Sequence, residues 1–215
     1  MIHYILPELA LDIMAKRRGY LIALEGVDGA GKTTQARLLT RWLGKVGVKA
    51  VYTYEPTDGP VGRLVRKHLA GRLRFSEEVA ALLFAADRVE HLNTVIRPAL
   101  MRGVTVVSDR YLHSSIAYQS ASTGRRRWVE QINSLAPEPD LSIFIDIPVE
   151  TALKRLRVRR SEIYERRKFL RSVRRHYLRL VRSRRMVLVD GVGSRGEVAG
   201  RVIEQVKRAI MRAGG

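Results

Sequence analysis

The chain has 215 residues, no cysteine and a formal net charge of +19, with a sequence pI near 11.1. A chain of this length typically forms one domain with a substantial core, and the lack of cysteine excludes disulfides, thiolate metal sites and a thiol nucleophile. No apolar run approaches the roughly 18 residues of a membrane helix, and the start lacks the order of a signal peptide. We therefore expect a cytoplasmic protein with no membrane partner.

Most of the positive charge lies in one segment. Residues 154–185 contain 15 Lys and Arg against two acids, which leaves +13 of the chain's +19 in this stretch. Such a run is either the solvated face of a helix or a patch that binds nucleic acid. Aromatic residues that would stack on bases do not alternate with these cations, so we expect no specific nucleic-acid partner.

Strand and helix patterns alternate along the chain. Runs of apolar or β-branched residues predict strands at residues 20–25, 49–54, 104–108, 141–145 and 186–189. Helical spacing of apolar residues predicts helices over residues 36–46, 61–69, 76–101 and 197–211, the third of them beginning at Ser76. This alternation predicts an α/β fold in which a parallel five-stranded sheet is flanked by helices.

One domain accounts for this alternation, over residues 19–215. Residues 1–18 stand apart from it, and Met14 offers an alternative start, so we treat them as an N-terminal extension. After residue 165 a helix carries apolar residues at near-helical spacing, which indicates a packing face, and its arginines are expected to be solvated. The packing face comprises Phe169, Val173, Tyr177 and Val181.

The most specific motif lies between the first predicted strand and the first predicted helix. Residues 26–33, GVDGAGKT, match G-x-x-x-x-G-K-[ST], in which glycines let backbone N–H groups turn toward nucleotide phosphates. Lys32 would reach the β and γ phosphates, and Thr33 would contact Mg²⁺. We expect the nucleotide to be bound by Gly26, Val27, Asp28, Gly29, Ala30, Gly31, Lys32, Thr33 and Thr34.

Two acids follow predicted strands and are candidates to hold the metal or its waters. Asp109 comes after VTVVS and precedes a hydroxyl-rich stretch suited to a polar ligand at the carboxyl end of a parallel sheet. Asp146 comes after LSIFI and precedes Ile147-Pro148, which is typical of a turn. We favour Asp109 as the metal residue and interpret Asp146 as a structural cap.

From about Gly19 to the C-terminus the chain resembles the thymidylate kinases. The blocks LEGVDGAGKTTQ, EPTDGPVGRLVR, LLFAADRVEH and SDRYLHSSIAYQ carry the resemblance in order, and ALKRLRVRRSEIYE is similar to the family's lid. The resemblance implies a three-layer P-loop kinase fold with a short mobile lid at about residues 155–165. It also implies ATP and Mg²⁺ as cofactors, dTMP as acceptor, and a homodimer.

The resemblance assigns base and sugar contacts to several residues. Asp28 would face the 3′-hydroxyl region of the acceptor sugar, although an Asp in a turn can also cap backbone N–H groups. Phe84 and Arg88 would stack on the thymine and contact its exocyclic carbonyl, although their spacing alone suits a core Phe and a surface Arg. Ser115 and Gln119 would hydrogen-bond the base.

The resemblance also assigns the residues beside the sugar and the phosphate. Tyr118 would pack against the 2′ side of the sugar, and Arg110 would hold the acceptor phosphate beside Asp109. By our interpretation Tyr111 belongs to the core, and His113 and Ser114 belong to a loop.

The catalytic arginines are expected in the lid, because Gly29 follows Asp28 where some relatives carry an Arg. Among the candidates Arg155, Arg157, Arg159 and Arg160 we favour Arg157 and Arg159.

A second departure is Tyr54, since many relatives carry a phosphate-binding Arg before Glu-Pro. Arg110, Arg63 or Arg66 would take over that role. Together with Lys32, Asp109 and Arg110, the lid arginines form the predicted catalytic set.

The sequence therefore predicts a kinase that transfers the γ-phosphoryl of ATP to dTMP. A kinase of another nucleoside monophosphate or of a deoxynucleoside is the alternative within enzymes. A nucleic-acid-binding NTPase that uses the basic segment is the alternative from another class.

Overall fold

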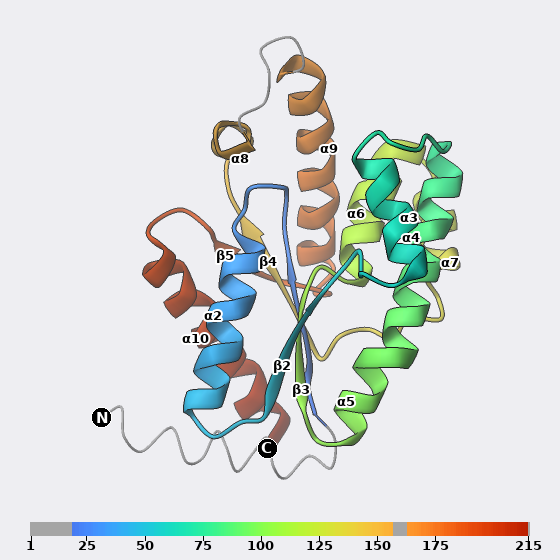
Figure 1. Ribbon diagram of the computed structural model, residues 1–215. Coiled ribbons are helices and arrows are strands. Elements are labelled where there is room, and N and C mark those ends of the chain that lie inside the picture. Colours follow the sequence, from blue (N-terminus) through green and yellow to red (C-terminus); the bar gives the residue numbers. More distant parts are fainter. Residues whose placement is uncertain (1–18, 157–162, 215) are drawn as a thin grey trace.

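A parallel sheet forms the centre of the computed structural model, which describes residues 19–156 and 163–214 (Figure 1). Within these residues the strand order is β2-β3-β1-β4-β5. The strands are β1 Leu21–Glu25, β2 Ala50–Tyr54, β3 Thr105–Asp109, β4 Leu141–Asp146 and β5 Val187–Asp190. The carboxyl ends of β1 and β3 meet, because Leu24 pairs with Asp109.

Helices cover both faces of this sheet (Figure 1). Helices α2 and α10 pack on one face, and α5, α6 and α9 lie on the other. The bounds are α2 Lys32–Lys45, α3 Pro60–Leu69, α4 Glu77–His91, the π-helical η1 Leu92–Ile96, α5 Arg97–Met101, α6 Leu112–Thr123, α7 Arg126–Ile132, α8 Val149–Leu156, α9 Ile163–Arg182 and α10 Arg195–Gly214. The predicted three-layer α/β architecture is confirmed.

Burial of apolar side chains on both faces of the sheet explains why these runs become strands. All five residues of β1 are buried, and Ile143, Phe144 and Ile145 of β4 are fully buried beside them. Each large aliphatic side chain removed from water contributes about 1.5–3 kcal/mol relative to an exposed position. The packing face predicted for α9 is confirmed, since Val173 and Tyr177 are fully buried.

The predicted boundaries agree with the structure to within a few residues. Ser76 caps α4 as expected, because its side chain accepts a hydrogen bond from the backbone N–H of Val79 at 3.3 Å. The helix predicted over residues 76–101 contains one π-helical turn, η1, and continues as α5 after it. Helices α6 and α7 were not predicted, whereas α8 follows directly on the turn expected at Ile147-Pro148.

The assignment of His113 and Ser114 to a loop is wrong, because both lie in α6 and are buried. Their polar groups find partners inside the protein. Ser114 Oγ donates to Glu25, and His113 Nδ1 lies 2.9 Å from Ser142 Oγ. Buried hydrogen-bond partners thus allow a hydroxyl-rich sequence to form a core helix. Tyr111 is fully buried, as expected of a core residue.

Asp146 is not a structural cap but the partner of an arginine on α9. Arg174 donates to its two carboxylate oxygens through Nε and a terminal nitrogen, each at 2.7 Å. Arg167 and Arg171 likewise pair with Glu150 of α8. These three arginines stay partly exposed, as expected, and they also form ion pairs, because acids of α8 and β4 lie against the same face of α9.

Within residues 19–156 and 163–214, none of the helices combines the length and the apolar character that a bilayer crossing requires.

Candidate active site

The phosphate loop connects β1 to α2 and needs its glycines for steric reasons. Gly26 and Gly29 have φ of 153° and 82°. A Cβ at Gly26 would lie 2.8 Å from the carbonyl oxygen of Ile145, and one at Gly29 would lie 3.1 Å from that of Ala152. Other residues would strain this backbone, so the loop keeps the shape that its motif predicts.

Lys32, the first residue of α2, points back into this loop. Its Nζ donates to the carbonyl of Val27 at 3.0 Å. Burial and the nearby Arg110 cation lower the pKa of Lys32 to about 8, although Asp28 and Asp109 act in the opposite direction. A bound phosphate would supply the counter-charge that the buried ammonium lacks.

Thr33 and Asp109 lie together at the carboxyl ends of the central strands. The Thr33 hydroxyl donates to Asp109 Oδ2, while Asp109 Oδ1 is buried without a hydrogen-bond partner. In the part of the chain that the structure describes, no group of three or more His, Asp or Glu could hold a metal ion. One carboxylate and one hydroxyl fit Mg²⁺, which commonly takes its other ligands from water and nucleotide phosphates.

Arg110 follows Asp109 and has a φ of 72°, an uncommon value for a residue with a side chain. Two hydrogen bonds hold this conformation. Its N–H donates to Leu24 O at 3.0 Å, and the Ser108 hydroxyl donates to its carbonyl at 2.7 Å. Such strain clusters at functional sites, and here it places the guanidinium 4.8 Å from the centroid of the Tyr118 ring.

Asp28 lies between two guanidinium groups. Arg110 donates to its Oδ1, and Arg166 of α9 donates to its Oδ2 at 3.2 Å. Although burial opposes it, the cations Arg110, Lys32 and Arg166 lower the pKa of Asp28. The carboxylate therefore pairs with side-chain cations rather than with the backbone N–H groups of its own turn, and its own N–H donates to Tyr118 Oη at 2.9 Å.

A cavity of about 300 Å³ begins at Asp28 and extends between α4 and α6. Every residue that the resemblance assigns to the acceptor lines it, and the structure therefore brings these separate sequence blocks together. The residues assigned to the acceptor that line the cavity are Asp28, Phe84, Arg88, Arg110, Ser115, Tyr118 and Gln119. Sequence reasoning missed His68, Leu69, Glu77 and Arg166, which also line the cavity.

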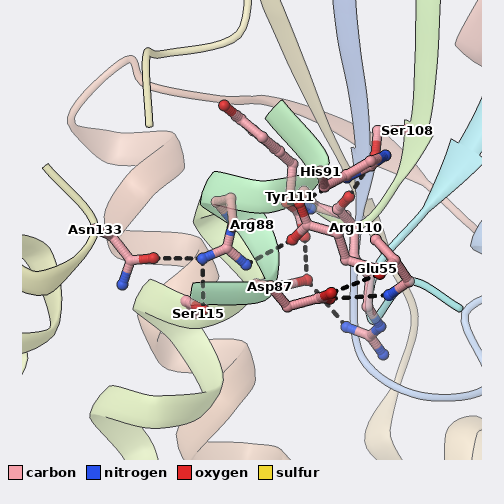
Figure 2. A network of polar contacts seen from close by, with 12 residues as sticks. Glu55, Asp87, Arg88, His91, Ser108, Arg110, Tyr111, Ser115 and Asn133 are labelled. Atoms are coloured by element: carbon pink, nitrogen blue, oxygen red, sulfur yellow. Dashed lines mark hydrogen bonds and ion pairs between the residues drawn. The ribbon is translucent and has the colours of Figure 1, made fainter. Parts of the chain in front are cut away.

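Arg88 occupies the deep end of this cavity, and it is not the surface charge that its spacing alone would suggest. Only 1% of the residue is exposed. One terminal nitrogen donates to Ser115 Oγ at 2.9 Å and to Asn133 Oδ1, and the other donates to Glu55 at 2.7 Å (Figure 2). Arg88 Nε is buried without a hydrogen-bond partner.

Glu55 connects this arginine to the end of β2. Its second carboxylate oxygen lies 3.1 Å from His91 Nδ1, and His91 Nε2 lies 2.6 Å from Thr53 Oγ1. Asn133 is fixed from the other side, since its amide nitrogen donates to Val129 O at 2.8 Å. Sequence reasoning assigned no role to Glu55, His91 and Asn133. Glu55 and His91 stand in two of the family blocks, whereas no block contains Asn133.

A second space lies beside the phosphate loop and shares residues with the acceptor cavity. Lys32, Thr33, Tyr54, Arg66 and Asp109 are among its lining residues. Arg66 lies over the Tyr54 ring at 5.4 Å and donates to Thr57 O at 3.2 Å.

Arg63 donates to Asp58 O at 2.7 Å. Of the three cations suggested to compensate for Tyr54, Arg66 and Arg110 are thus among the residues that line this space, and Arg63 is not.

A third space, of about 280 Å³, lies on the far side of the loop. Loop residues 29–31, Thr34 and Gln35 face Gly191, Gly193 and Ser194 across it. The turn after β5 is therefore brought to the phosphate loop, as a site for the nucleoside part of a donor nucleotide requires.

Arg157 and Arg159, the predicted lid arginines, lie outside the described residues. Arg155, at the end of α8, donates to the carbonyl of Gly29 at 3.0 Å.

The family model for thymidylate kinase matches residues 24–202. The probable thymidylate kinase of Pyrococcus abyssi is 44% identical over 202 residues, covering 90% of this chain and 98% of that protein. The probable thymidylate kinase of Pyrobaculum aerophilum is 42% identical over 190 residues, covering 88% of this chain and 97% of that protein. The chain belongs to the thymidylate kinase family.

Proposed function

We propose that this protein transfers the γ-phosphoryl group of ATP to dTMP, giving dTDP and ADP, a step in deoxynucleotide biosynthesis. One observation supports this activity beyond family membership. A single cavity joins Phe84 and Arg88, suited to a base, to Asp28 and Arg110, suited to a sugar and a phosphate. Asp28 and Arg110 also line the space beside the phosphate loop, so a bound acceptor would lie next to the donor phosphates.

The deep end of the cavity favours a base with a carbonyl group. A guanidinium group only donates hydrogen bonds, and Arg88 Nε has no partner in the protein. A thymine carbonyl could accept from Arg88, whereas the amino group of cytosine would meet another donor. Phe84, at the wall of the same cavity, supplies a ring on which a base can stack.

The phosphate end favours phosphoryl transfer by positioning and charge neutralisation. Lys32 would bind the donor phosphates, Arg110 would hold the acceptor phosphate, and Asp28 would orient the acceptor sugar. Thr33 and Asp109 would hold Mg²⁺, which when bound neutralises phosphate charge. Transfer would be in line, with no covalent bond to the protein, and Arg157 and Arg159 would contribute charge from the lid.

Tyr118 would form the wall beside the sugar. Its ring is held edge-on against Phe169 and Tyr177, with centroids 6.0 and 6.4 Å away. A wall fixed in this way would exclude a 2′-hydroxyl by steric contact and so favour a deoxyribose. The homodimer and the cytoplasmic location stay predictions.

The test is ADP formation from ATP and Mg²⁺ with dTMP, dUMP, UMP, CMP, AMP, thymidine or no acceptor. We expect turnover to be highest with dTMP and to fall to background without an acceptor. Higher turnover with CMP or AMP would contradict the assignment of Arg88 as a reader of a base carbonyl. Phosphorylation of thymidine in preference to dTMP would contradict the role of Arg110.

A further inference from the structure

Arg166 lies in the first turn of α9. That end of α9 and the phosphate loop after β1 lie at the same end of the sheet (Figure 1). Its guanidinium lines the acceptor cavity and donates to Asp28 Oδ2 at 3.2 Å. The side chain keeps 45% of its surface exposed, so it can change partner without leaving a buried pocket. Arg166 thus faces the point where a phosphate attached to the acceptor sugar would lie.

The neighbouring arginines of α9 face other parts of the molecule. Arg167 and Arg171 pair with Glu150, and Arg174 pairs with Asp146. Arg166 differs from these because its acid, Asp28, already pairs with Arg110. One carboxylate between two guanidinium groups leaves an excess of positive charge at this end of the cavity.

Two further charges strengthen that excess. Lys32 acts on Asp28 from the phosphate loop as a third cation. Arg166 also lies near the positive end of the α9 dipole, where a cation is disfavoured by about 0.3–1 kcal/mol at an exposed position. An anion that joins Arg110 and Arg166 would remove this electrostatic conflict.

We propose that Arg166 binds the phosphate of the acceptor nucleotide together with Arg110, and that Asp28 holds both arginines while the cavity is empty. The inference rests on the proposed function, because it assumes a mononucleotide acceptor. The phosphate dianion offers oxygens to both guanidinium groups, and each can donate two hydrogen bonds. Asp28, released from the arginines, is then free to accept a hydrogen bond from a sugar hydroxyl.

The other cations near the cavity are less suited to this role. Arg88 lies at the deep end and uses both terminal nitrogens on Ser115, Asn133 and Glu55. Arg66 stacks on Tyr54 and donates to the loop after β2. Among the described residues that line the acceptor cavity, Arg110 and Arg166 are therefore the arginines available for a phosphate.

The test compares binding of dTMP with binding of thymidine, which has the same base and sugar but no phosphate. Equilibrium titrations without ATP would use the wild-type protein, Arg166→Met, Arg166→Lys and the control Arg171→Met, which alters an arginine of α9 that pairs with Glu150. We expect Arg166→Met to weaken dTMP binding roughly 10- to 100-fold. Thymidine binding should stay within about twofold.

The variants separate a phosphate contact from a structural role. Arg166→Lys should retain part of the dTMP affinity because it keeps the charge, and Arg171→Met should bind both ligands as the wild type does. Equal loss of dTMP and thymidine binding in Arg166→Met would overturn the proposal, as would no loss of either.

If the proposed function is wrong, the wild-type protein should bind a nucleoside monophosphate other than dTMP more tightly than it binds dTMP. The Arg166 variants would then be compared in their binding of that monophosphate and of its nucleoside. Equal loss of both, or loss of neither, would again overturn the proposal for Arg166.

Discussion

The two ends of the acceptor cavity hold their charges in opposite ways. At the deep end, Arg88 is surrounded by permanent partners, and its ion pair with Glu55 is almost fully buried. At the phosphate end, Arg110 and Arg166 share the single carboxylate of Asp28, and all three side chains are partly exposed. The charge of Arg88 is therefore balanced within the protein, whereas the phosphate end has an excess of cations.

This difference suggests separate tasks for the two ends, recognition of the base at the deep end and binding of the phosphate charge at the other. A buried network holds both terminal nitrogens of Arg88 and leaves one donor, Arg88 Nε, without a partner in a fixed place, which suits discrimination between bases. Ion pairs that are partly exposed are weak and can be exchanged for a stronger anion. On the roles we propose, the residue that reads the base, Arg88, is held rigidly, and the residues that bind the phosphate, Arg110 and Arg166, pair with Asp28 while the cavity is empty.

Glu55→Ala should have the largest effect, at the deep end. It leaves the buried charge of Arg88 without a counter-ion, and breaking such a pair costs about 3–5 kcal/mol. Chemical denaturation measures this loss in the free energy of unfolding. The matched control is Glu150→Ala, whose exposed pairs with Arg167 and Arg171 contribute up to about 1 kcal/mol each. An equal loss of unfolding free energy in Glu55→Ala and Glu150→Ala would contradict the contrast between a buried and an exposed ion pair.

Lys32→Ala tests the phosphate end. We expect kcat to fall about 10²- to 10³-fold, because a charge aimed at the transferring phosphoryl group is removed. The control is Lys45→Ala, at the exposed end of the same helix, which should leave kcat unchanged. Near-normal turnover of Lys32→Ala would show that the loop does not neutralise phosphate charge in the way we describe.

Asn133→Ala should have a smaller effect at the deep end than Glu55→Ala. It removes one neutral acceptor from Arg88, which costs about 1–3 kcal/mol of stability. The preference for dTMP over dCMP should also fall, because Arg88 loses one of its fixed partners. Asn133→Asp, which keeps an acceptor, should retain more of the preference. The exposed Asn93→Ala is the control.

The protonation of Lys32 gives the smallest effect. Its pKa in the folded protein is about 8, below the ordinary value of 10.5, so it loses its proton as the pH rises through 8. Bound phosphate favours the charged form, so ATP binding between pH 8 and 9 should take up part of a proton. Calorimetry in buffers of different ionisation enthalpy measures this uptake, and Lys32→Met should abolish it.

The lowered pKa of Lys32 also makes the free energy of unfolding depend on pH, in the opposite direction to a lysine whose pKa is raised by an ion pair. Between pH 8 and 10.5 the unfolded chain keeps the proton that folded Lys32 has lost. The stability of the wild type relative to Lys32→Met should therefore rise with pH across this window. A fall across the same window would mean that the folded protein stabilises the charged lysine before any nucleotide binds.

The phosphate loop and the sheet could be predicted from the sequence because they depend on local patterns. The motif over residues 26–33 has fixed spacing, and the strands are continuous apolar runs. Short helices such as α7 carry too few turns for a clear period, and α6 is hidden by its hydroxyl groups. Local sequence patterns thus predict the sheet and the phosphate loop better than they predict short helices such as α7 or polar helices such as α6.

The candidate site was predictable only where a family motif carries it. Phe84 and Arg88 share one block, and both line the acceptor cavity. Asn133 and Arg166 lie outside the quoted family blocks and reach the site through long-range packing. A run of arginines gives no sign that Arg166 faces Asp28 while Arg167 faces Glu150.

The measurement that tests this account most directly is the binding of dTMP, dCMP and thymidine to the wild-type protein at low and high KCl. Salt screens partly exposed charges much more than buried ones. We predict that KCl weakens the binding of dTMP and the binding of dCMP by a similar factor, so that the preference for dTMP over dCMP is retained. The binding of thymidine should change little. An equal weakening of thymidine, or a preference for dTMP that disappears with salt, would contradict the separation of base reading from phosphate binding.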